Sequence, residues 1–358
     1  WIKIMAYSSI AKPTDYFNTK LYTGDGNNSK AITGVGFQPD WIWIKKRSGT
    51  ASHMISDSVR GVTKTIYTES TSAELTSDQY GWVSAFGTDG FTISNTNVGA
   101  INENGATHVS WNWKAGTGAG SSNSDGSITT TVSANQTAGF SIVSYTGNAT
   151  AGATIGHGLG VAPKMVIVKN RSNAQNWFIY HEGIGATKVI YLDLTNAQQT
   201  LTQGWNDTAP TSSVFSVGTE AGTNQSGANM IAYCFAEKQG YSKISSFVGN
   251  GSSNGTYVHL GFRPSFILYK VSSASSDWYL QDNKRLTFNV NNTRLEANNS
   301  DAEVTGAADS IDMLSNGFKM RHTSSSFNNN GATYIYYAVA ENPFVGNDSG
   351  TAVPVTAG

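Results

Sequence analysis

One motif occurs three times in this chain, and this repetition constrains the fold more than any other feature. Each copy is centred on a proline, with a glycine three residues before it, a lysine six residues after it and a serine nine residues after it. Four apolar residues directly precede the lysine. Because the copies are domain-sized distances apart, they predict three tandem domains. The aligned residues are Gly36, Pro39, Lys45 and Ser48; Gly160, Pro163, Lys169 and Ser172; and Gly261, Pro264, Lys270 and Ser273.

Patterns inside each copy predict β-strands. The four apolar residues are β-branched, aromatic or aliphatic and too few for a helix, which is typical of a central strand covered on both faces. Each copy closes with a segment in which every second residue is apolar, so these side chains should face a core. The chain is therefore predicted to be all-β, with three tandem β-sandwich (jelly-roll-like) domains related by internal repeats. The predicted inward-facing residues are Val109, Trp111 and Trp113; Ile231, Tyr233 and Phe235; and Ile335, Tyr337 and Val339.

The spacing of the copies predicts the domain boundaries. The predicted segments are an N-terminal arm (1–13), sandwich domains over 14–116, 138–240 and 241–345, and a C-terminal tail (346–358). A segment rich in Gly, Ser and Thr, residues 117–137, separates the first two domains and is typical of a flexible linker. The second and third domains follow each other directly at Gln239-Gly240, so we expect them to move as one unit more than either does with the first.

Charge and composition exclude several classes of partner. Only 13% of the residues are charged and the net charge is −1, which argues against electrostatic capture of nucleic acid or of an anionic membrane. No apolar run reaches the roughly 18 residues that span a bilayer, and the opening residues lack the apolar core of a secretory signal. The single cysteine, Cys234, cannot form an intrachain disulfide and is expected to be a buried thiol.

No motif for catalysis, cofactor or metal binding is present. The nucleophile elbow, the phosphate loop and the zinc-protease motif are missing, and the six histidines show no ligand spacing. The glycine-rich stretch Gly156–Gly160 precedes a predicted strand, so a turn is favoured over a phosphate loop. Trp41 and Trp43 could form a sugar-stacking platform, but their run is apolar on both faces, which favours a core position. We expect no catalytic residue, cofactor or metal.

Two recurring polar positions remain as weak candidates for binding. One is the repeated lysine, which either ends the central strand with its stem over core aromatics and its ammonium in water, or makes a shared ligand or inter-subunit contact; the first interpretation is favoured. The other lies eighteen residues after the proline and holds Asp, His and Asp. Because these types differ, a strand end or loop is favoured over a shared catalytic role. The candidates are Lys45, Lys169, Lys270, Asp57, His181 and Asp282.

Long stretches of the chain resemble a family of repeat-containing structural proteins of marine tailed bacteriophages, including cyanophages. The stretches are Met5–Lys20, the strand Gly-Phe-x-Pro-Asp-Trp-Ile-Trp-Ile-Lys, Val109–Gly120 and Ile155–Lys164. The resemblance covers nearly the whole chain and offers no catalytic residues. It implies a virion component, such as a tail fibre, another appendage or a capsid decoration, made in the host bacterial cytoplasm without a signal peptide. Its partners would be copies of itself and other virion proteins.

Three hypotheses for function follow. The first is a non-enzymatic structural protein of the virion that acts by assembly and by host recognition. The second is a lectin-like module that binds a glycan of the host surface. The third is a glycan depolymerase, which needs a pair of carboxylates in a cleft, and the acidic residues form no recurring or clustered pair. A shared framework with varied loops favours binding and assembly over turnover.

Overall fold

The computed structural model describes residues 8–95, 100–116, 118–306, 310–343, 345–348 and 351–354. Over these residues the protein is built from antiparallel β-sheets, which confirms the predicted all-β class. None of the helices in this part of the chain is long and apolar enough to cross a membrane. They are a 3-10 turn, η1 (Pro13–Asp15), and three single-turn helices, α1 (Thr202–Trp205), α2 (Ala221–Asn224) and α3 (Ser325–Asn328).

One large antiparallel sheet forms the framework of each repeat. The three sheets share the order opening strand, closing strand, the strand with the apolar run, and then a meander, and the second sheet has two further strands beside its opening strand. The first sheet contains β1 (Phe17–Thr23), β9 (Thr107–Trp113), β3 (Trp41–Lys46), β4 (Met54–Asp57), β5 (Lys64–Tyr67) and β6 (Leu75–Thr76). The second contains β10 (Ser121–Asn123), β11 (Thr130–Asn135), β12 (Phe140–Thr146), β19 (Asn229–Phe235), β14 (Met165–Asn170), β15 (Phe178–His181), β16 (Lys188–Tyr191) and β17 (Gln199–Thr200). The third contains β20 (Ser242–Val248), β28 (Thr333–Pro343), β22 (Phe262–Val271), β23 (Tyr279–Asp282), β24 (Thr293–Glu296) and β25 (Val304–Thr305).

A smaller sheet packs against each large sheet, so every repeat is β-sandwich-like. Each sandwich has a hydrophobic core of its own. Ile42, Val166 and Ile267, from the apolar runs, are fully buried in these cores, which confirms that the runs are interior strands. The small sheets contain β2 (Ser29–Thr33), β8 (Gly90–Ser94) and β7 (Trp82–Gly87); β13 (Ala153–Gly156) and β18 (Val214–Val217); and β21 (Tyr257–His259), β27 (Gly317–Met320) and β26 (Ile311–Leu314).

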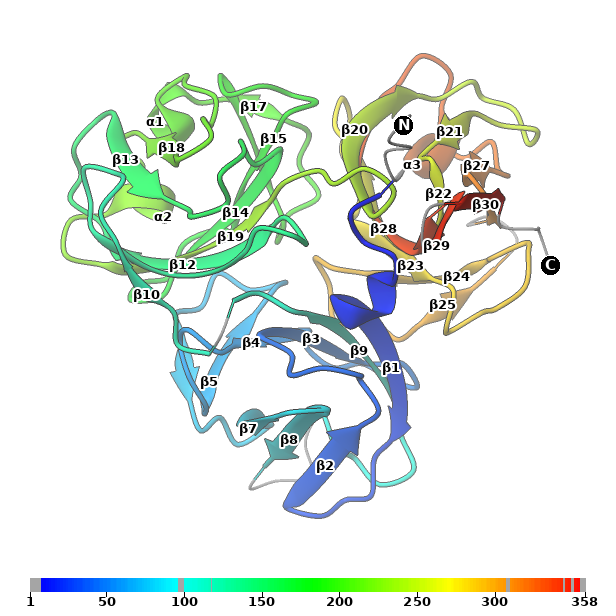
Figure 1. Cartoon of the computed structure of the whole chain (residues 1–358), viewed down its shortest axis with the longest axis horizontal. Helices are drawn as coiled ribbons and strands as arrows, with labels where there is room; N and C mark the ends of the chain where they lie inside the picture. The colour runs from blue at the N-terminus through cyan, green and yellow to red at the C-terminus, as the bar shows by residue number, and fades with distance from the viewer. Residues whose placement is uncertain are drawn as a thin grey trace.

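The three large sheets pack against one another around a common centre. Figure 1 shows the repeats as three lobes, coloured blue to cyan, green, and yellow to red. One aromatic-rich cluster, called here the central core, contains residues from all three lobes. The Trp41 ring centroid lies 4.8 Å from that of Tyr233, and Phe235 lies 4.9 Å from Tyr337. These ring contacts cross from the first repeat to the second and from the second to the third.

The alternating residues of the closing strands face the central core. All nine residues predicted to point inward belong to it, so their burial is confirmed, but this core lies between repeats and not inside one sandwich. Trp41 and Trp43 also belong to it and are about 1% exposed, which excludes a sugar platform at these rings. The strands of the apolar runs therefore serve two cores, one on each face.

Residues 118–137 extend the sheet of the second repeat, so the prediction of a flexible linker over 117–137 is wrong for the part that the structure describes. Strand β11 pairs with β12 from Thr131–Ser144 to Asn135–Phe140, and β10 pairs with β11. Val132 is 7% exposed and packs into the core of the second sandwich. The Thr and Val residues that made this segment look like polar spacer are good strand formers once a partner edge is present. The repeats are therefore residues 14–116, 117–240 and 241–343.

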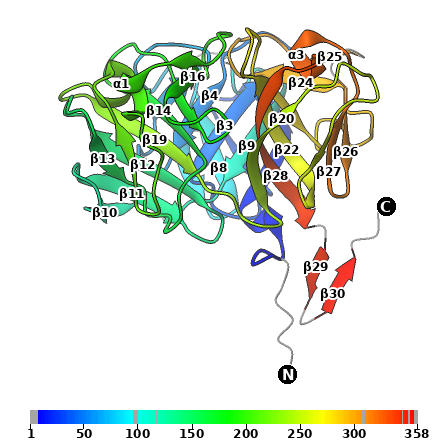
Figure 2. The ribbon, with the colours of Figure 1, turned by 90° about the horizontal axis from the view of Figure 1, so that it is seen from above.

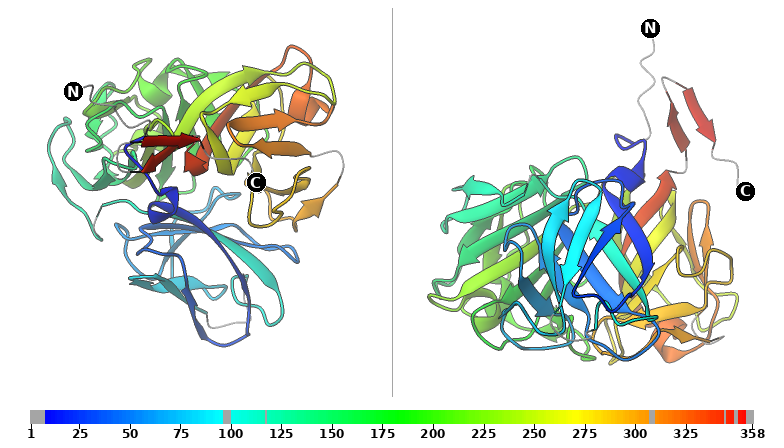
Figure 3. Two further views of the ribbon diagram at one scale, coloured as in Figure 1. Left: turned by 45° about the vertical axis from the view of Figure 1, so that its right-hand side comes forward. Right: turned by 90° about the horizontal axis from the view of Figure 1, so that it is seen from below.

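The central core joins all three repeats and not only the second and third, which are predicted to move together. Part of the predicted arm is anchored there too, since Ile10 is 2% exposed within it. Residues 1–7 of the arm and 355–358 of the tail lie outside the described residues. Within the predicted tail, β29 (Val345–Asp348) and β30 (Thr351–Pro354) form a hairpin that stands away from the three lobes (Figures 2 and 3).

Candidate functional site

Each of the three repeated lysines donates a hydrogen bond to a neighbouring repeat. All three are fully buried, so their ammonium groups do not reach water as the favoured interpretation required. Burial lowers the pKa of each lysine to about 8. Each ammonium donates to a carbonyl of the preceding repeat, where the third repeat counts as preceding the first, which makes this position an internal contact and not a ligand site. The Nζ atoms donate as follows: Lys45 to Ser300 O (3.1 Å), Lys169 to Thr71 O (2.7 Å) and Lys270 to Thr195 O (2.9 Å).

The Asp, His, Asp position ends a strand in every repeat and also faces the next repeat. Asp57, His181 and Asp282 are the last residues of β4, β15 and β23 and are at most 1% exposed. The three positions lie in different repeats, and the side chain at each position makes one hydrogen bond to a neighbouring repeat. The contacts are Tyr233 Oη to Asp57 Oδ2 (2.7 Å), His181 Nε2 to Tyr336 O (3.2 Å) and Trp111 Nε1 to Asp282 Oδ2 (3.0 Å).

Each of the two aspartates anchors a buried ion-pair network. In the first repeat Arg60 Nε donates to Asp57 Oδ2 (2.5 Å) and Arg60 also reaches Glu74 (3.2 Å). Glu74 in turn receives two bonds of 2.9 Å from Arg171 of the second repeat. Burial opposes the charge on Glu74, but the bonds and charges of the two arginines hold its pKa below the usual value.

The third repeat builds the same network against the first. Arg285 Nε donates to Asp282 Oδ2 (2.6 Å), and Arg285 reaches Glu303 (3.1 Å). Glu303 receives bonds of 2.8 and 2.7 Å from Arg47 of the first repeat. Burial opposes the charge on Asp282, but the Arg285 guanidinium and its bonds hold the pKa of this carboxyl below its usual value.

The second repeat replaces the ion pair by a neutral histidine. Burial lowers the pKa of His181 to about 4, so the ring is uncharged at neutral pH. Its Nδ1 accepts from the Gly183 amide (3.0 Å), which leaves the proton on Nε2 for the bond to the Tyr336 carbonyl. The position of Arg60 and Arg285 is held here by Ile184. The second repeat thus contains neither the aspartate nor the arginine of the other two.

Sequence reasoning missed a third repeated polar residue, an asparagine three positions before the closing glycine. Asn102, Asn224 and Asn328 are fully buried. In each repeat its side-chain amide donates to the loop after the opening strand and its oxygen accepts an amide of that loop. The same alignment that revealed the lysine contains this spacing. The repeated serine is structural as well, since Ser48, Ser172 and Ser273 accept the first amide of the closing strand.

Other polar groups noted in the sequence have structural positions. Gly158 and Gly160 have φ values of 71°, so the glycine-rich stretch is a turn as predicted. Cys234 is fully buried, and burial raises the pKa of its thiol. In the described part of the chain, no group of three or more His, Cys, Asp or Glu side chains is placed to hold a metal ion.

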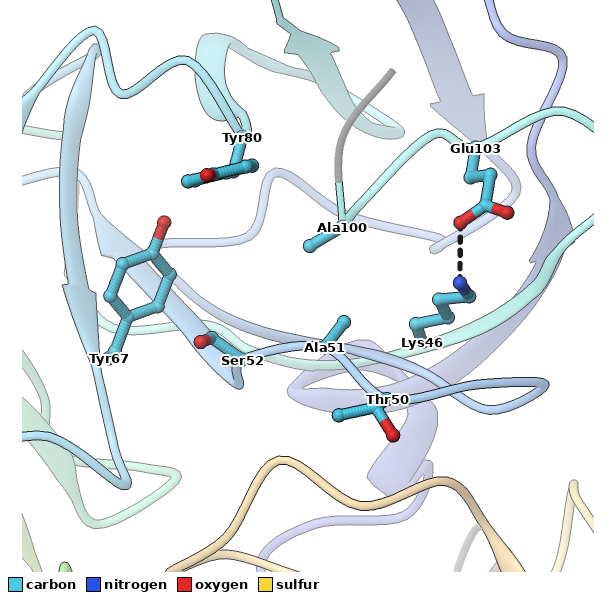
Figure 4. A pocket seen from close by; sticks show the side chains of 8 residues that line it. All are labelled: Lys46, Thr50, Ala51, Ser52, Tyr67, Tyr80, Ala100 and Glu103. Atoms are coloured by element: carbon cyan, nitrogen blue, oxygen red, sulfur yellow. Dashed lines mark hydrogen bonds and ion pairs between the residues drawn. The ribbon is translucent and has the colours of Figure 1, made fainter. Parts of the chain in front are cut away.

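An open pocket in the first repeat is the candidate site. Its volume is about 360 Å³, within the roughly 300–1,000 Å³ of small-ligand sites. Figure 4 shows Tyr67 and Tyr80 at one end and the Lys46–Glu103 ion pair at the other. Ser52 is among the small side chains between them. The remaining lining residues are Thr50, Ala51 and Ala100.

Met54, which is buried in the core of the first sandwich beneath the strand ends, corresponds to an aromatic residue in each of the other repeats. The position of Met54 is Phe178 in the second repeat, where a Cβ on Gly222 of α2 would lie 2.0 Å from the Phe178 ring. In the third repeat it is Tyr279, whose ring centroid lies 4.4 Å from that of Phe327 in α3.

Comparison with known proteins assigns the chain to a family. No curated protein and no solved structure matches it at a significant level. A family model described as "Domain of unknown function (DUF7483)" matches residues 12–343, a range that includes all three repeats. Because this match covers most of the sequence, the chain belongs to the DUF7483 family.

Proposed function

We propose that this chain is a non-enzymatic structural protein that acts by assembly and binding. One observation carries the proposal: the polar residues common to all three repeats make hydrogen bonds that hold the fold together. The lysine joins neighbouring repeats, while the asparagine and serine fix loops and strand ends. What differs between repeats is the loops and the pocket, and varied loops on a fixed framework are a common way to present binding surfaces.

The setting we propose is a virion, as a tail fibre, another appendage or a capsid decoration. This rests on the resemblance to bacteriophage structural proteins described above. In that setting the protein is made in the host cytoplasm and its partners are copies of itself, other virion proteins and host-surface glycans. A body in which all three repeats share one core suits an exposed particle component, because no repeat can unfold without exposing part of that core.

We further propose that each repeat is a jelly-roll-like sandwich. The support is that the chain crosses repeatedly between the two sheets: β1 and β9 are neighbours in the large sheet, and β2 and β8 are neighbours in the small one. Superposition of an experimental structure on two-sheet jelly rolls tests this description.

Two measurements test the functional proposal. Antibodies raised against the purified chain should label phage particles in electron micrographs, and labelling of no virion structure would contradict the virion setting. The purified chain, incubated with bacterial surface polysaccharide, should leave the polymer length unchanged. Shortened products that disappear on a single carboxylate-to-amide change would replace the proposal by a depolymerase.

A further inference from the structure

We propose that the pocket of the first repeat binds a neutral saccharide. This inference rests on the proposed binding function and adds the ligand class and the residues. The pocket combines an exposed aromatic ring, a charged donor and acceptor that neutralise each other, and no net positive charge. Each of these three features restricts the class of ligand that the pocket can bind.

The aromatic end favours a ligand with an apolar face. Tyr80 is 49% exposed and lines the pocket, although tyrosine rings elsewhere in this protein are mostly buried. Tyr67 stands beside it, and its hydroxyl donates to Asp78. Burial, followed by this bond, raises the pKa of Tyr67, so its hydroxyl stays protonated. A ring face left open to solvent can cover the C–H face of a pyranose and remove apolar area from water.

The opposite end favours hydroxyl groups. Lys46 Nζ and Glu103 Oε2 form an ion pair whose lysine side chain is 12% and glutamate side chain 45% exposed. Among the described residues, the second carboxylate oxygen of Glu103 receives no hydrogen bond, and an ammonium has three protons to donate. A vicinal diol offers one acceptor and one donor to this pair at the same time without separating its charges.

Charge disfavours ionic ligands. Lys46 and Glu103 cancel, while Asp78 behind Tyr67 and Glu69 behind Ser52 add negative or neutral groups. Burial raises the pKa of Glu69. An acidic sugar would meet these carboxylates, and a free amino acid would have to break the existing ion pair. A neutral sugar does neither.

The test uses the full chain and a panel of methyl glycosides of glucose, galactose, mannose and N-acetylglucosamine, with methyl glucuronide as the anionic arm. Saturation-transfer NMR detects binding and a titration gives Kd. We expect at least one neutral glycoside to bind and to bind more tightly than methyl glucuronide. Tyr80→Ala and Glu103→Gln should each weaken binding about tenfold, as expected for a lost stacking face or charged hydrogen bond.

Tyr257→Ala is the matched control, because Tyr257 is a tyrosine of similar exposure (43%) in the third repeat and outside the pocket. It should leave Kd unchanged. The inference is overturned if no neutral glycoside binds, if Tyr80→Ala and Tyr257→Ala act alike, or if the glucuronide binds best. Any of these results, with host polysaccharide still uncut and virions still labelled, would leave the proposed function standing.

Discussion

Two of the three interfaces between repeats contain a buried ion-pair network, and the third contains no ion pair between the residues that the structure describes. Glu74 meets Arg171 between the first and second repeats, and Glu303 meets Arg47 between the third and first, with nearly equal distances. Between the second and third repeats the equivalent residues are Gln198 and Ser272. Their backbone bond, Gln198 N to Ser272 O at 2.9 Å, matches those of the other two interfaces.

The comparison separates the contacts that every interface between repeats contains from the contacts that only some of them contain. All three interfaces keep a buried lysine on a neighbouring carbonyl, the paired backbone bonds and a share of the central core. Only two keep the guanidinium–carboxylate pairs. Since burying an ion pair costs desolvation energy that its attraction only partly offsets, a neutral interface can be as stable as a charged one. We therefore expect the networks to add little net stability to the two interfaces that contain them.

The largest expected effect on the free energy of unfolding comes from changes in the central core, which all three interfaces share. Trp43→Ala, in the central core, should lower the free energy of unfolding by about 3–5 kcal/mol, and Leu268→Ala, its counterpart in the third repeat, by about 2–5 kcal/mol. Urea denaturation measures both. Losses near zero at both sites would mean that the central core does not hold the repeats together.

The next-largest expected loss of stability differs between the interfaces that contain an ion-pair network and the interface that contains His181. Asp282→Ala leaves Arg285 buried without its carboxylate and should cost about 3–5 kcal/mol. His181→Ala removes only neutral hydrogen bonds and should cost about 1–3 kcal/mol. The same denaturation measurement checks both variants. Equal losses would contradict the distinction drawn between the interfaces.

The framework of the fold was readable from the sequence because β-structure leaves a period of two. The closing strands, the apolar runs and the strand-end position of Asp57, His181 and Asp282 were predicted correctly. The period shows which side chains share a face but not what covers that face, so the central core between repeats was missed. For the same reason residues 118–137 looked like a linker: their composition does not show that β11 pairs with both β10 and β12.

The inter-repeat contacts left a weaker signal, because three copies give little statistical power. Even so, His181, Ile184, Gln198 and Ser272 depart together from the Asp, Arg, Glu and Arg of the charged interface between the first and second repeats. Joint replacement of this kind indicates contact. The pocket could not be predicted, because most of the residues that line it lie in loops that carry no repeat pattern.

A smaller effect concerns pH and should be the same at all three interfaces. Folded lysines with a pKa of about 8 release protons that unfolded lysines, at about 10.4, still hold. Between these values the unfolded state binds more protons, so the free energy of unfolding should rise with pH, by about 1 kcal/mol per lysine from pH 7.5 to 9. Lys45→Met, Lys169→Met and Lys270→Met should each remove about one third of this rise. A pH profile that each of these variants leaves unchanged would contradict the lysine contacts.

The smallest expected effect is the most informative, because it grafts a charged interface onto the neutral one. The double variant His181→Asp and Ile184→Arg restores the pair found in the other two repeats, with the carbonyl of Ile179 as the counterpart of Ile55 and Leu280, which accept from Arg60 and Arg285. Attraction and desolvation should nearly cancel, so the free energy of unfolding should change by less than about 1 kcal/mol. Ile184→Arg alone is the control, and it should cost several times more because its charge lies at a partly buried position beside a neutral histidine. A gain above about 2 kcal/mol in the double variant would show instead that the ion pairs are a main source of cohesion between repeats, and that the neutral interface is the weak one.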